Sequence, residues 1–344
     1  MNVLYEAGFR IKAKQRQHSA HIKHILEEHI LRVVGWFANR DVDHLTRLTK
    51  AERTERLRTF GIKKLTWVLS LLDQIHGLLM TNRAATQREL FYGLVNVFDT
   101  QAQVNAQLQQ IVSWLEIPRD SLNVFASQKG LVAGMLTFVK GSLTLDCRRT
   151  GTGVLISETL VEVDRLESHA SYIIVVEKDA IFQTLCEQQI WNIIPCILIT
   201  GKGFPDFVTR KLLRRLQMSL NIECGYVGDF DPHGISIFLS YQHGSRAFEG
   251  PLVRCAVLHW IGLCFEDLEQ LPVDVRLPLL SRDRALLKSL LVHPKIRDCE
   301  RLQAQCSFMM EHDTKFEIEA ITCLGFEYLA RYYIPSKILK RTWI

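Results

Sequence analysis

The sequence predicts an α/β protein of two domains, in which a mostly helical module precedes a parallel, Rossmann-like sheet. Its 344 residues exceed the length of a usual single domain. Hydrophobic residues make up 47% of the chain and charged residues 23%, which is typical of a globular protein and excludes a disordered one. Three apolar segments between residues 171 and 234 alternate with two segments of helical length, and this alternation predicts the sheet.

The three apolar segments are the predicted strands. They run from Ser171 to Glu177, within 195–203 and within 222–234, and the segments between them, 178–191 and 205–220, have the length of helices. Continuous rather than alternating apolar residues indicate strands buried on both faces, as in a parallel sheet. Ligands of such sheets bind beyond the carboxyl ends of the strands.

Three acids follow these strands. Glu177 closes the first strand, and Asp229 and Asp231 close the third. Carboxylates at one edge of a buried sheet repel one another unless a cation lies between them. Hard oxygen ligands with room for water suit Mg2+, so we predict a Mg2+ site here. The alternative for the two aspartates is ordinary turn chemistry before Pro232 and Gly234.

Composition excludes several classes of protein. The nine cysteines form no Cys-x-x-Cys pair, which argues against a zinc site and a disulfide framework and favours a reducing compartment. The longest apolar run, Cys255 to Phe265, is interrupted by His259 and is too short to span a membrane. The first residues lack a secretory pattern. A net charge of +5 does not by itself establish a nucleic-acid partner.

Residues 1–64 are predicted to be an N-terminal helical and basic extension. Residues 7–26 contain no acid, and their basic residues would suit an arm that contacts phosphates or, equally, a solvated tail: Arg10, Lys12, Lys14, Arg16 and Lys23, with His18, His21 and His24. The mixed, charged composition of 38–64 predicts a mobile connection or exposed helices.

A compact module is predicted at 65–145. Apolar residues recur at helical spacing from Leu65 to Leu79, and further helices are predicted at 87–98 and 101–115. Two apolar runs, 121–126 and 131–139, then flank a turn at Lys129-Gly130 and are predicted to form a hairpin. Three helices followed by a two-stranded wing predict a winged-helix (CAP-like) domain, a fold that docks on DNA.

The second of these helices carries an unusual tyrosine. At about 100° per residue, Tyr92 falls opposite the apolar stripe of its helix. Arg88 lies four residues earlier on the same face and can reach the phenol. On a helix that faces DNA, such a tyrosine is a candidate nucleophile. The alternative is an ordinary surface tyrosine.

These residues carry a family resemblance. Arg-Glu-Leu-Phe-Tyr at 88–92 resembles the active-site motif of the topoisomerase VI A subunits and of the related eukaryotic meiotic double-strand-break transesterases. The block at 121–134 is similar to the family's next motif. Val-Glu-Lys-Asp-Ala-Ile-Phe, Thr-Gly-Lys-Gly-Phe-Pro-Asp and Gly-Asp-Phe-Asp-Pro-His-Gly resemble its Toprim motifs, and 333–344 resembles its closing segment. The resemblance covers about 65–344, with all blocks in order.

The resemblance implies a function and a site. It implies that Tyr92 is the nucleophile, that Arg88 assists it, and that the three acids hold Mg2+. It also implies that 146–344 is a Toprim metal-binding domain with a C-terminal extension. The partners implied are double-stranded DNA, a second copy of the chain, accessory proteins and a topoisomerase VI B-like subunit. Each active site of the dimer would pair one protomer's tyrosine with the other's metal.

Departures from the family pattern touch packing or specificity rather than the chemical groups. Phe91 stands where a second tyrosine is often found, and Gln87 where a lysine is usual. Phe230 separates the aspartates where a smaller residue is common. Arg341 replaces a frequent glycine near the end of the chain.

The chemistry follows from these parts. Forming a phenolate from a free phenol at neutral pH costs about 4 kcal/mol, and an arginine stabilises both the anion and the reacting phosphate. Attack on DNA would give a 5′-phosphotyrosyl bond and a free 3′ hydroxyl. Two attacks, one per protomer, would make a double-strand break, with Mg2+ offsetting charge on the phosphate. The expected enzyme is a type IIB topoisomerase-like transesterase of the isomerase class.

Three functions are compatible with the resemblance. The first is a nuclear enzyme that initiates meiotic recombination and stays attached to the DNA. The second is the A subunit of a type IIB topoisomerase that reseals DNA with an ATPase partner. The partner would have to bind the ATP, because this chain has no Gly-x-x-x-x-Gly-Lys-Ser/Thr phosphate loop. The third is a non-catalytic DNA-binding scaffold of the same fold. Neither a scaffold nor a Toprim nuclease needs the outward tyrosine together with the acids.

DNA contacts are predicted at loops. Lys129 at the wing turn, Lys202 in its glycine-flanked loop and Phe204 beside it suit phosphate and groove contacts. The alternative for Lys202 is a solvated turn lysine. The basic run from Arg210 to Arg215 is interpreted as a solvated helix face.

Overall fold

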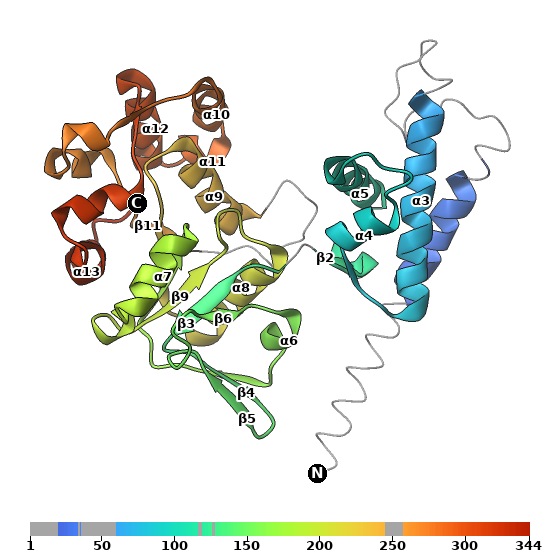
Figure 1. Ribbon diagram of the computed structural model, residues 1–344, viewed down its shortest axis with the longest axis horizontal. Helices are drawn as coiled ribbons and strands as arrows, with labels where there is room; N and C mark the ends of the chain where they lie inside the picture. The colour runs from blue at the N-terminus through green and yellow to red at the C-terminus, as the bar shows by residue number, and fades with distance from the viewer. Residues whose placement is uncertain (1–19, 34, 36–59, 116–118, 126–127, 245–256) are drawn as a thin grey trace. The chain divides into compact units, whose positions relative to one another are not determined.

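The computed structural model describes residues 20–33, 35, 60–115, 119–125, 128–244 and 257–344. Its internal contacts divide the chain into two compact units (Figure 1). Of the described residues, unit 1 contains those up to 125 and unit 2 those from 128 onward. The basic residues from Arg10 to His18 and most of the predicted extension lie outside the described residues.

Unit 1 is helical around its own apolar core. Residues 20–33 are helical, and α3 (Phe60–Thr81), α4 (Gln87–Gly93) and α5 (Gln101–Leu115) follow. The predicted spacing is confirmed in α3 and α5, whose apolar faces are buried together with residues of the first helix and of α4. The prediction for α4 is too long by five residues, because the helix ends at Gly93, a poor helix former.

The predicted wing is wrong. The only strands in the described part of unit 1 are β1 (Ala85–Thr86) and β2 (Val124–Phe125), which pair in parallel. The second half of the predicted hairpin instead becomes β3 (Leu131–Gly134), which pairs with strands of unit 2. Val132 and Ala133 are fully buried there, whereas a wing would expose one face. The predicted domain boundary at 145/146 therefore falls inside unit 2.

The centre of unit 2 is the predicted parallel sheet. Strands β8 (Tyr172–Val176), β9 (Cys196–Thr200) and β10 (Glu223–Val227) occur where the apolar segments predict them. The six-stranded order is β11-β10-β8-β9-β3-β6, where β11 is His259–Trp260 and β6 is Val154–Leu155. Neighbours from β11 to β9 are parallel, and β3 runs antiparallel to β9 and β6.

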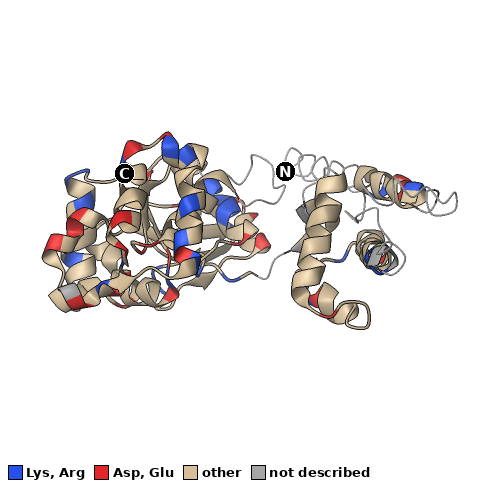
Figure 2. Cartoon of the chain, turned by 90° about the horizontal axis from the view of Figure 1, so that it is seen from above, with Lys and Arg blue, Asp and Glu red and all other residues tan. Residues whose placement is uncertain are grey.

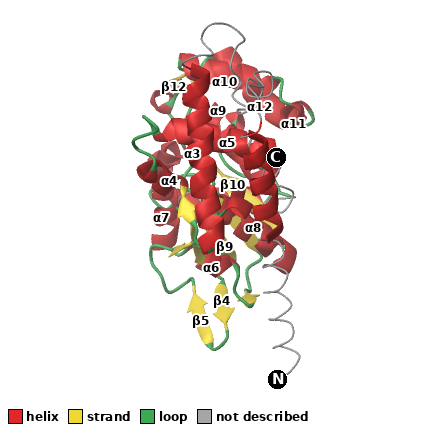
Figure 3. Cartoon of the chain, turned by 90° about the vertical axis from the view of Figure 1, so that its right-hand side faces the viewer, coloured by secondary structure: helices red, strands yellow, loops and turns green. Residues whose placement is uncertain are grey.

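Helices cover this sheet on both faces. From β8 the chain passes through α7 (Asp179–Glu187) to β9 on one side of β8, and from β9 it returns through α8 (Phe207–Leu220) to β10 on the other side. Right-handed crossovers in opposite directions place α7 and α8 on opposite faces, as Figure 3 shows. This cover explains why every residue of β9 is buried. After β10 the chain enters α9 (Pro232–His243).

Smaller elements surround the sheet. A three-stranded sheet contains β4 (Thr137–Lys140), β5 (Leu143–Asp146) and β7 (Arg165–Glu167), and the β4–β5 hairpin projects from unit 2 (Figures 1 and 3). The helix α6 (Glu158–Val161) contacts α8. 3₁₀ turns occur in both units, at Arg119–Leu122, Ile190–Asn192, Phe265–Gln270, Val273–Val275 and Ile318–Leu324.

The C-terminal part of unit 2 is helical and returns to the sheet edge. It contains α10 (Ser281–Leu291), α11 (Pro294–Arg297), α12 (Glu300–His312) and, after a π-helical turn at Leu329–Tyr333, α13 (Ile334–Leu339). Strands β12 (Leu277–Pro278) and β13 (Thr314–Lys315) pair antiparallel. Phe316 then exchanges backbone hydrogen bonds with Phe230. No described helix is both long and apolar enough to cross a membrane.

Candidate active site

The three predicted acids lie at one edge of the sheet of unit 2. Val176 and Val227, the last residues of β8 and β10, are register partners, so the residues after them emerge together. The backbone amide of Asp229 donates to Glu177 Oε2 at 3.2 Å. We call Glu177, Asp229 and Asp231 the acid cluster. The apolar segments predicted this grouping, and the strand register explains it.

Glu177 is held by a buried tyrosine. The hydroxyl group of Tyr226 donates to Glu177 Oε2 at 3.0 Å, and the Tyr226 side chain is fully buried. Residue 228 is glycine because a Cβ there would lie 2.6 Å from Glu177 Oε2 and 2.5 Å from the ring of Tyr226. Sequence reasoning missed Tyr226, whose only signal was its place in an apolar strand.

Both aspartates accept hydrogen bonds from the protein. The amide of Ile318 donates to Asp229 Oδ1 at 2.8 Å, and the ammonium group of Lys178 lies 3.0 Å from Asp229 Oδ2. Asp231 is the N-cap of α9 and accepts from the amide of Gly234 at 2.5 Å. Asp231 therefore caps a helix, where the alternative for the sequence was turn chemistry, and it also lies in the acid cluster.

Burial and mutual repulsion raise the pKa values of these acids and so disfavour their ionised forms. Burial, followed by the charges of Asp229 and Asp231, raises the pKa of Glu177 to about 8. Burial also raises the pKa of Asp229 to about 6, against the hydrogen bond from Ile318 and the charge of Lys178. The pKa of Asp231 is raised by burial as well. A bound cation would reverse this effect by stabilising the ionised carboxylates.

The donor set fits a hard divalent cation. Three carboxylates offer the oxygen ligands that Mg2+ prefers, and their clustering is unfavourable without a positive charge. In the described part of the chain, no three His, Cys, Asp or Glu side chains are already arranged to hold a metal ion together. Since the oxygens instead accept bonds from Tyr226, Lys178 and Ile318, binding requires some of these contacts to be exchanged.

Tyr92 and Arg88 are placed together in unit 1. Thr86 and Glu89 form a capping box at the start of α4, which fixes the first turn of this short helix. Leu90 is buried and Tyr92 is 59% exposed, as the helical spacing predicts. Arg88 Nη2 donates to the Tyr92 hydroxyl at 3.1 Å. The phenol oxygen therefore faces solvent next to a guanidinium group.

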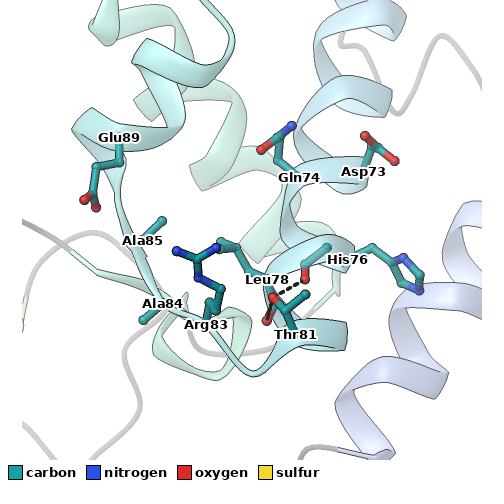
Figure 4. A pocket seen from close by; sticks show the side chains of 10 residues that line it. Asp73, Gln74, His76, Leu78, Thr81, Arg83, Ala84, Ala85 and Glu89 are labelled. Atoms are coloured by element: carbon teal, nitrogen blue, oxygen red, sulfur yellow. Dashed lines mark hydrogen bonds between the residues drawn. The ribbon is translucent and has the colours of Figure 1, made fainter.

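A separate pocket of about 440 Å³ opens between α3 and the start of α4. Figure 4 shows its polar lining, which includes Asp73, His76, Arg83 and Glu89. Neither Tyr92 nor Arg88 lines it. The candidate nucleophile is thus on open surface rather than in this pocket.

The predicted DNA-contact lysines are neighbours in unit 2, and both are engaged. Lys129 Nζ donates to the backbone oxygen of Lys202 at 2.9 Å, and Lys202 Nζ lies 3.0 Å from Asp179. Lys202 adopts a left-handed backbone with φ of 52°, while the amide of Gly203 donates to the backbone oxygen of Glu177. This glycine-flanked loop therefore packs beside the acid cluster. Phe204 is 49% exposed.

Figure 2 marks the Lys and Arg residues of the chain in blue. The basic run on α8 is not simply a solvated face, which corrects the sequence interpretation. Arg210 is only 2% exposed. Arg215 donates to the backbone oxygens of Val161 and Val163, and Lys211 pairs with Glu158. Lys211 and Arg215 therefore attach α8 to the segment around α6.

Comparisons with known proteins identify families and relatives that match both units of the chain. The Toprim-domain family of topoisomerase 6 A subunits and Spo11 matches residues 172–338, and the family described as "Type IIB DNA topoisomerase" matches residues 63–124. The A3 subunit of DNA topoisomerase 6 from Oryza sativa subsp. indica is 35% identical over 85% of this chain and 68% of its own length. Meiotic recombination protein SPO11 of Homo sapiens is 33% identical, covering 87% and 76%. Meiotic recombination protein SPO11-2 of Arabidopsis thaliana is 33% identical, covering 88% and 81%.

Proposed function

This chain belongs to the family of topoisomerase 6 A subunits and Spo11, which are DNA-cleaving enzymes, and from that premise we propose that it makes the double-strand breaks that initiate meiotic recombination. The observation that carries the proposal is the exposed phenol of Tyr92 beside Arg88, in a chain that also assembles the acid cluster. A DNA-binding scaffold would have no chemical use for either.

The proposed reaction is a transesterification. The Tyr92 oxygen loses its proton and attacks a DNA phosphorus, the bond from phosphorus to the 3′ oxygen breaks, and the 3′ oxygen takes up a proton. The products are a 5′-phosphotyrosyl bond and a free 3′ hydroxyl, so the energy of the phosphodiester is conserved. Arg88, already within 3.1 Å of the phenol oxygen, would stabilise its negative charge.

The acid cluster would hold Mg2+. Glu177, Asp229 and Asp231 are the ligands we propose, on the strength of their shared edge, their oxygen chemistry and their raised pKa values. Bound Mg2+ supplies Lewis-acid stabilisation of a phosphate that is changing its charge. Tyr226, by donating to Glu177, would hold that carboxylate in its place at the edge.

Unit 1 is proposed to dock on DNA. The three helices α3, α4 and α5 provide the body of a winged-helix-type module, although the wing predicted at 121–139 does not form. Lys129, Lys202 and Phe204 of unit 2 would add contacts to the DNA, whereas Lys211 and Arg215 of α8 bind the segment around α6 instead. The basic residues within 7–26 would add phosphate contacts.

The proposed partners are double-stranded DNA, a second copy of the chain and a topoisomerase VI B-like subunit, in the nucleus. The nucleophile and the acid cluster lie on different units, which is the arrangement needed if each active site pairs one protomer's tyrosine with the other's metal. If the chain also passes and reseals DNA, a separate ATPase partner would have to supply the coupling, because the sequence contains no Gly-x-x-x-x-Gly-Lys-Ser/Thr loop.

The test is covalent attachment to DNA in the source cells. Tyr92→Phe keeps the ring but removes the attacking oxygen, so protein recovered on DNA 5′ ends under denaturing conditions should disappear while DNA binding persists. Tyr332→Phe, at a tyrosine with 61% exposure, is the matched control and should leave attachment unchanged. Attachment that survives Tyr92→Phe rejects the nucleophile. Attachment in dividing cells that is resealed would favour a topoisomerase role over a meiotic one.

A further inference from the structure

Lys178 occupies a position that the proposed reaction does not explain. It follows Glu177 directly, and its ammonium group lies among three carboxylates. Lys178 Nζ is 3.0 Å from Asp229 Oδ2, 3.2 Å from Glu317 Oε2 and 2.6 Å from Glu319 Oε2. One of these acids belongs to the acid cluster and the other two do not.

The two glutamates are held beside the acid cluster by the backbone. Phe316 pairs with Phe230, and the amide of Ile318 donates to Asp229 Oδ1. The segment 316–319 therefore follows the edge of the sheet, and its two glutamates flank the residue that donates to Asp229. Glu317 and Glu319 are themselves half exposed, with side-chain accessibilities of 58% and 41%.

The lysine and a divalent cation compete for one carboxylate. Asp229 is buried, and Lys178 is the cation that pairs with it among the described ion pairs. Two positive charges on the same carboxylate repel each other strongly at such short range. Lys178 already contacts Glu317 and Glu319, and its contact with Glu319 is shorter than its contact with Asp229, so it can release Asp229 and still keep two carboxylates.

We propose that Lys178 is a positioning residue that exchanges between Asp229 and the pair Glu317 and Glu319. It neutralises Asp229 while the site holds no metal, and the two glutamates retain its ammonium group when a divalent cation takes that carboxylate. The inference rests on the metal site of the proposed function and adds a resident cation that sets its affinity.

The test measures Mn2+ binding to the intact chain without DNA, by calorimetric titration, so that it needs no catalysis. Lys178→Met removes the competing cation and should tighten Mn2+ binding about fivefold or more. Glu317→Gln with Glu319→Gln leaves Lys178 on Asp229 and should weaken binding by a similar factor. In the Lys178→Met background the two glutamate substitutions should change the Kd for Mn2+ by less than about twofold, because there is no longer an ammonium group for the glutamates to hold.

The matched control is Lys211, a lysine of the same unit that also pairs with two glutamates. Lys211 Nζ lies 2.8 Å from Glu158 and 3.5 Å from Glu162. Lys211→Met, alone or with Glu158→Gln, makes the same change of charge at a different place. It should leave the Kd for Mn2+ within about twofold of the unmodified chain, since surface charges at a distance are screened.

Two results would overturn the exchange. If the glutamate substitutions weaken Mn2+ binding equally with and without Lys178, the glutamates act on the metal directly. If Lys178→Met weakens binding while its melting temperature in EDTA is unchanged, the lysine supports the metal rather than competing with it. Mn2+ binding that survives Glu177→Gln with Asp229→Asn would instead refute the metal site itself. The Tyr92→Phe attachment assay reports separately on the nucleophile.

Discussion

The hydroxyl group of Tyr226 offers a test of how the acid cluster is supported. Tyr226→Phe removes one oxygen from a fully buried ring and leaves Glu177 Oε2 with the Asp229 amide as its remaining donor among the described hydrogen bonds. A hydrogen bond to a charged acceptor contributes roughly 1.5–3 kcal/mol. Metal binding keeps Glu177 ionised, and the loss of such an outer-shell partner typically costs about 10- to 100-fold in metal affinity, so Mn2+ or Mg2+ binding should weaken by about that factor.

The same change should affect folding less than metal binding. Without metal, burial keeps Glu177 largely protonated at neutral pH, because its pKa is raised to about 8. A hydrogen bond to an uncharged acceptor is worth only about 1 kcal/mol. Tyr226→Phe should therefore lower the free energy of unfolding in EDTA by about 1 kcal/mol, while its effect on the metal Kd is larger.

The assay pairs a Mn2+ titration with thermal unfolding in EDTA, and Tyr241→Phe is the control. Tyr241 is equally buried, and none of the described hydrogen bonds joins its hydroxyl group to the acid cluster. It should keep the Kd of the unmodified chain within about twofold. Equal loss of Mn2+ binding in both variants would mean a general loosening of the core and would refute the reasoning, as would unchanged binding in Tyr226→Phe.

Three further outcomes are expected. In EDTA the melting temperature should fall as pH rises from about 5 to about 8, because a carboxyl group whose pKa is raised in the folded state stabilises the fold only while it is protonated. Mg2+ should reduce this fall in melting temperature, and Glu177→Gln should flatten the profile. A flat profile in the unmodified chain would contradict the raised pKa of Glu177. Gly228→Ala places a methyl group 2.6 Å from a carboxylate oxygen, so it should lower the free energy of unfolding by about 1–3 kcal/mol and weaken metal binding. The control Gly77→Ala lies in α3 with open space around it and should raise the free energy of unfolding by about 0.5–1 kcal/mol in the same thermal melts. Thr86→Ala removes the capping box and should destabilise α4 by about 0.5–2 kcal/mol. Covalent attachment to DNA should fall but not disappear. Attachment equal to that of the unmodified chain would show that the cap does not position Tyr92.

The central fold was predictable because its signal is local. Continuous apolar runs predicted β8, β9 and β10, and regular spacing predicted α3 and α5. The failure of the predicted wing could not be foreseen, because a turn signal at Lys129-Gly130 gives no information about strand partners that are distant in the sequence. Asp206 accepts from the backbone amides of both residues, which turns the chain toward β9 instead of into a hairpin.

The placement of the three acids at one edge of the sheet was predictable from the sequence, whereas their hydrogen-bond partners were not. Glu177 and Asp229 follow strands whose parallel register could be inferred, whereas Ile318 reaches Asp229 from 89 residues away. Phe230, a departure from the family pattern, stacks on Phe316 with ring centroids 4.6 Å apart. Arg341, another departure, has a φ of 51°, so the frequent glycine there has a conformational reason.

The bond from Ile318 to Asp229 also decides when the acid cluster can be completed. A translating ribosome delivers Asp229 and Phe230 well before it delivers Phe316 and Ile318, which secure them. A product that stops early, within the intervening helices, would carry the tyrosine but lack the segment that fixes the aspartate. An incomplete chain would therefore present the phenol of α4 without a fully secured acid cluster.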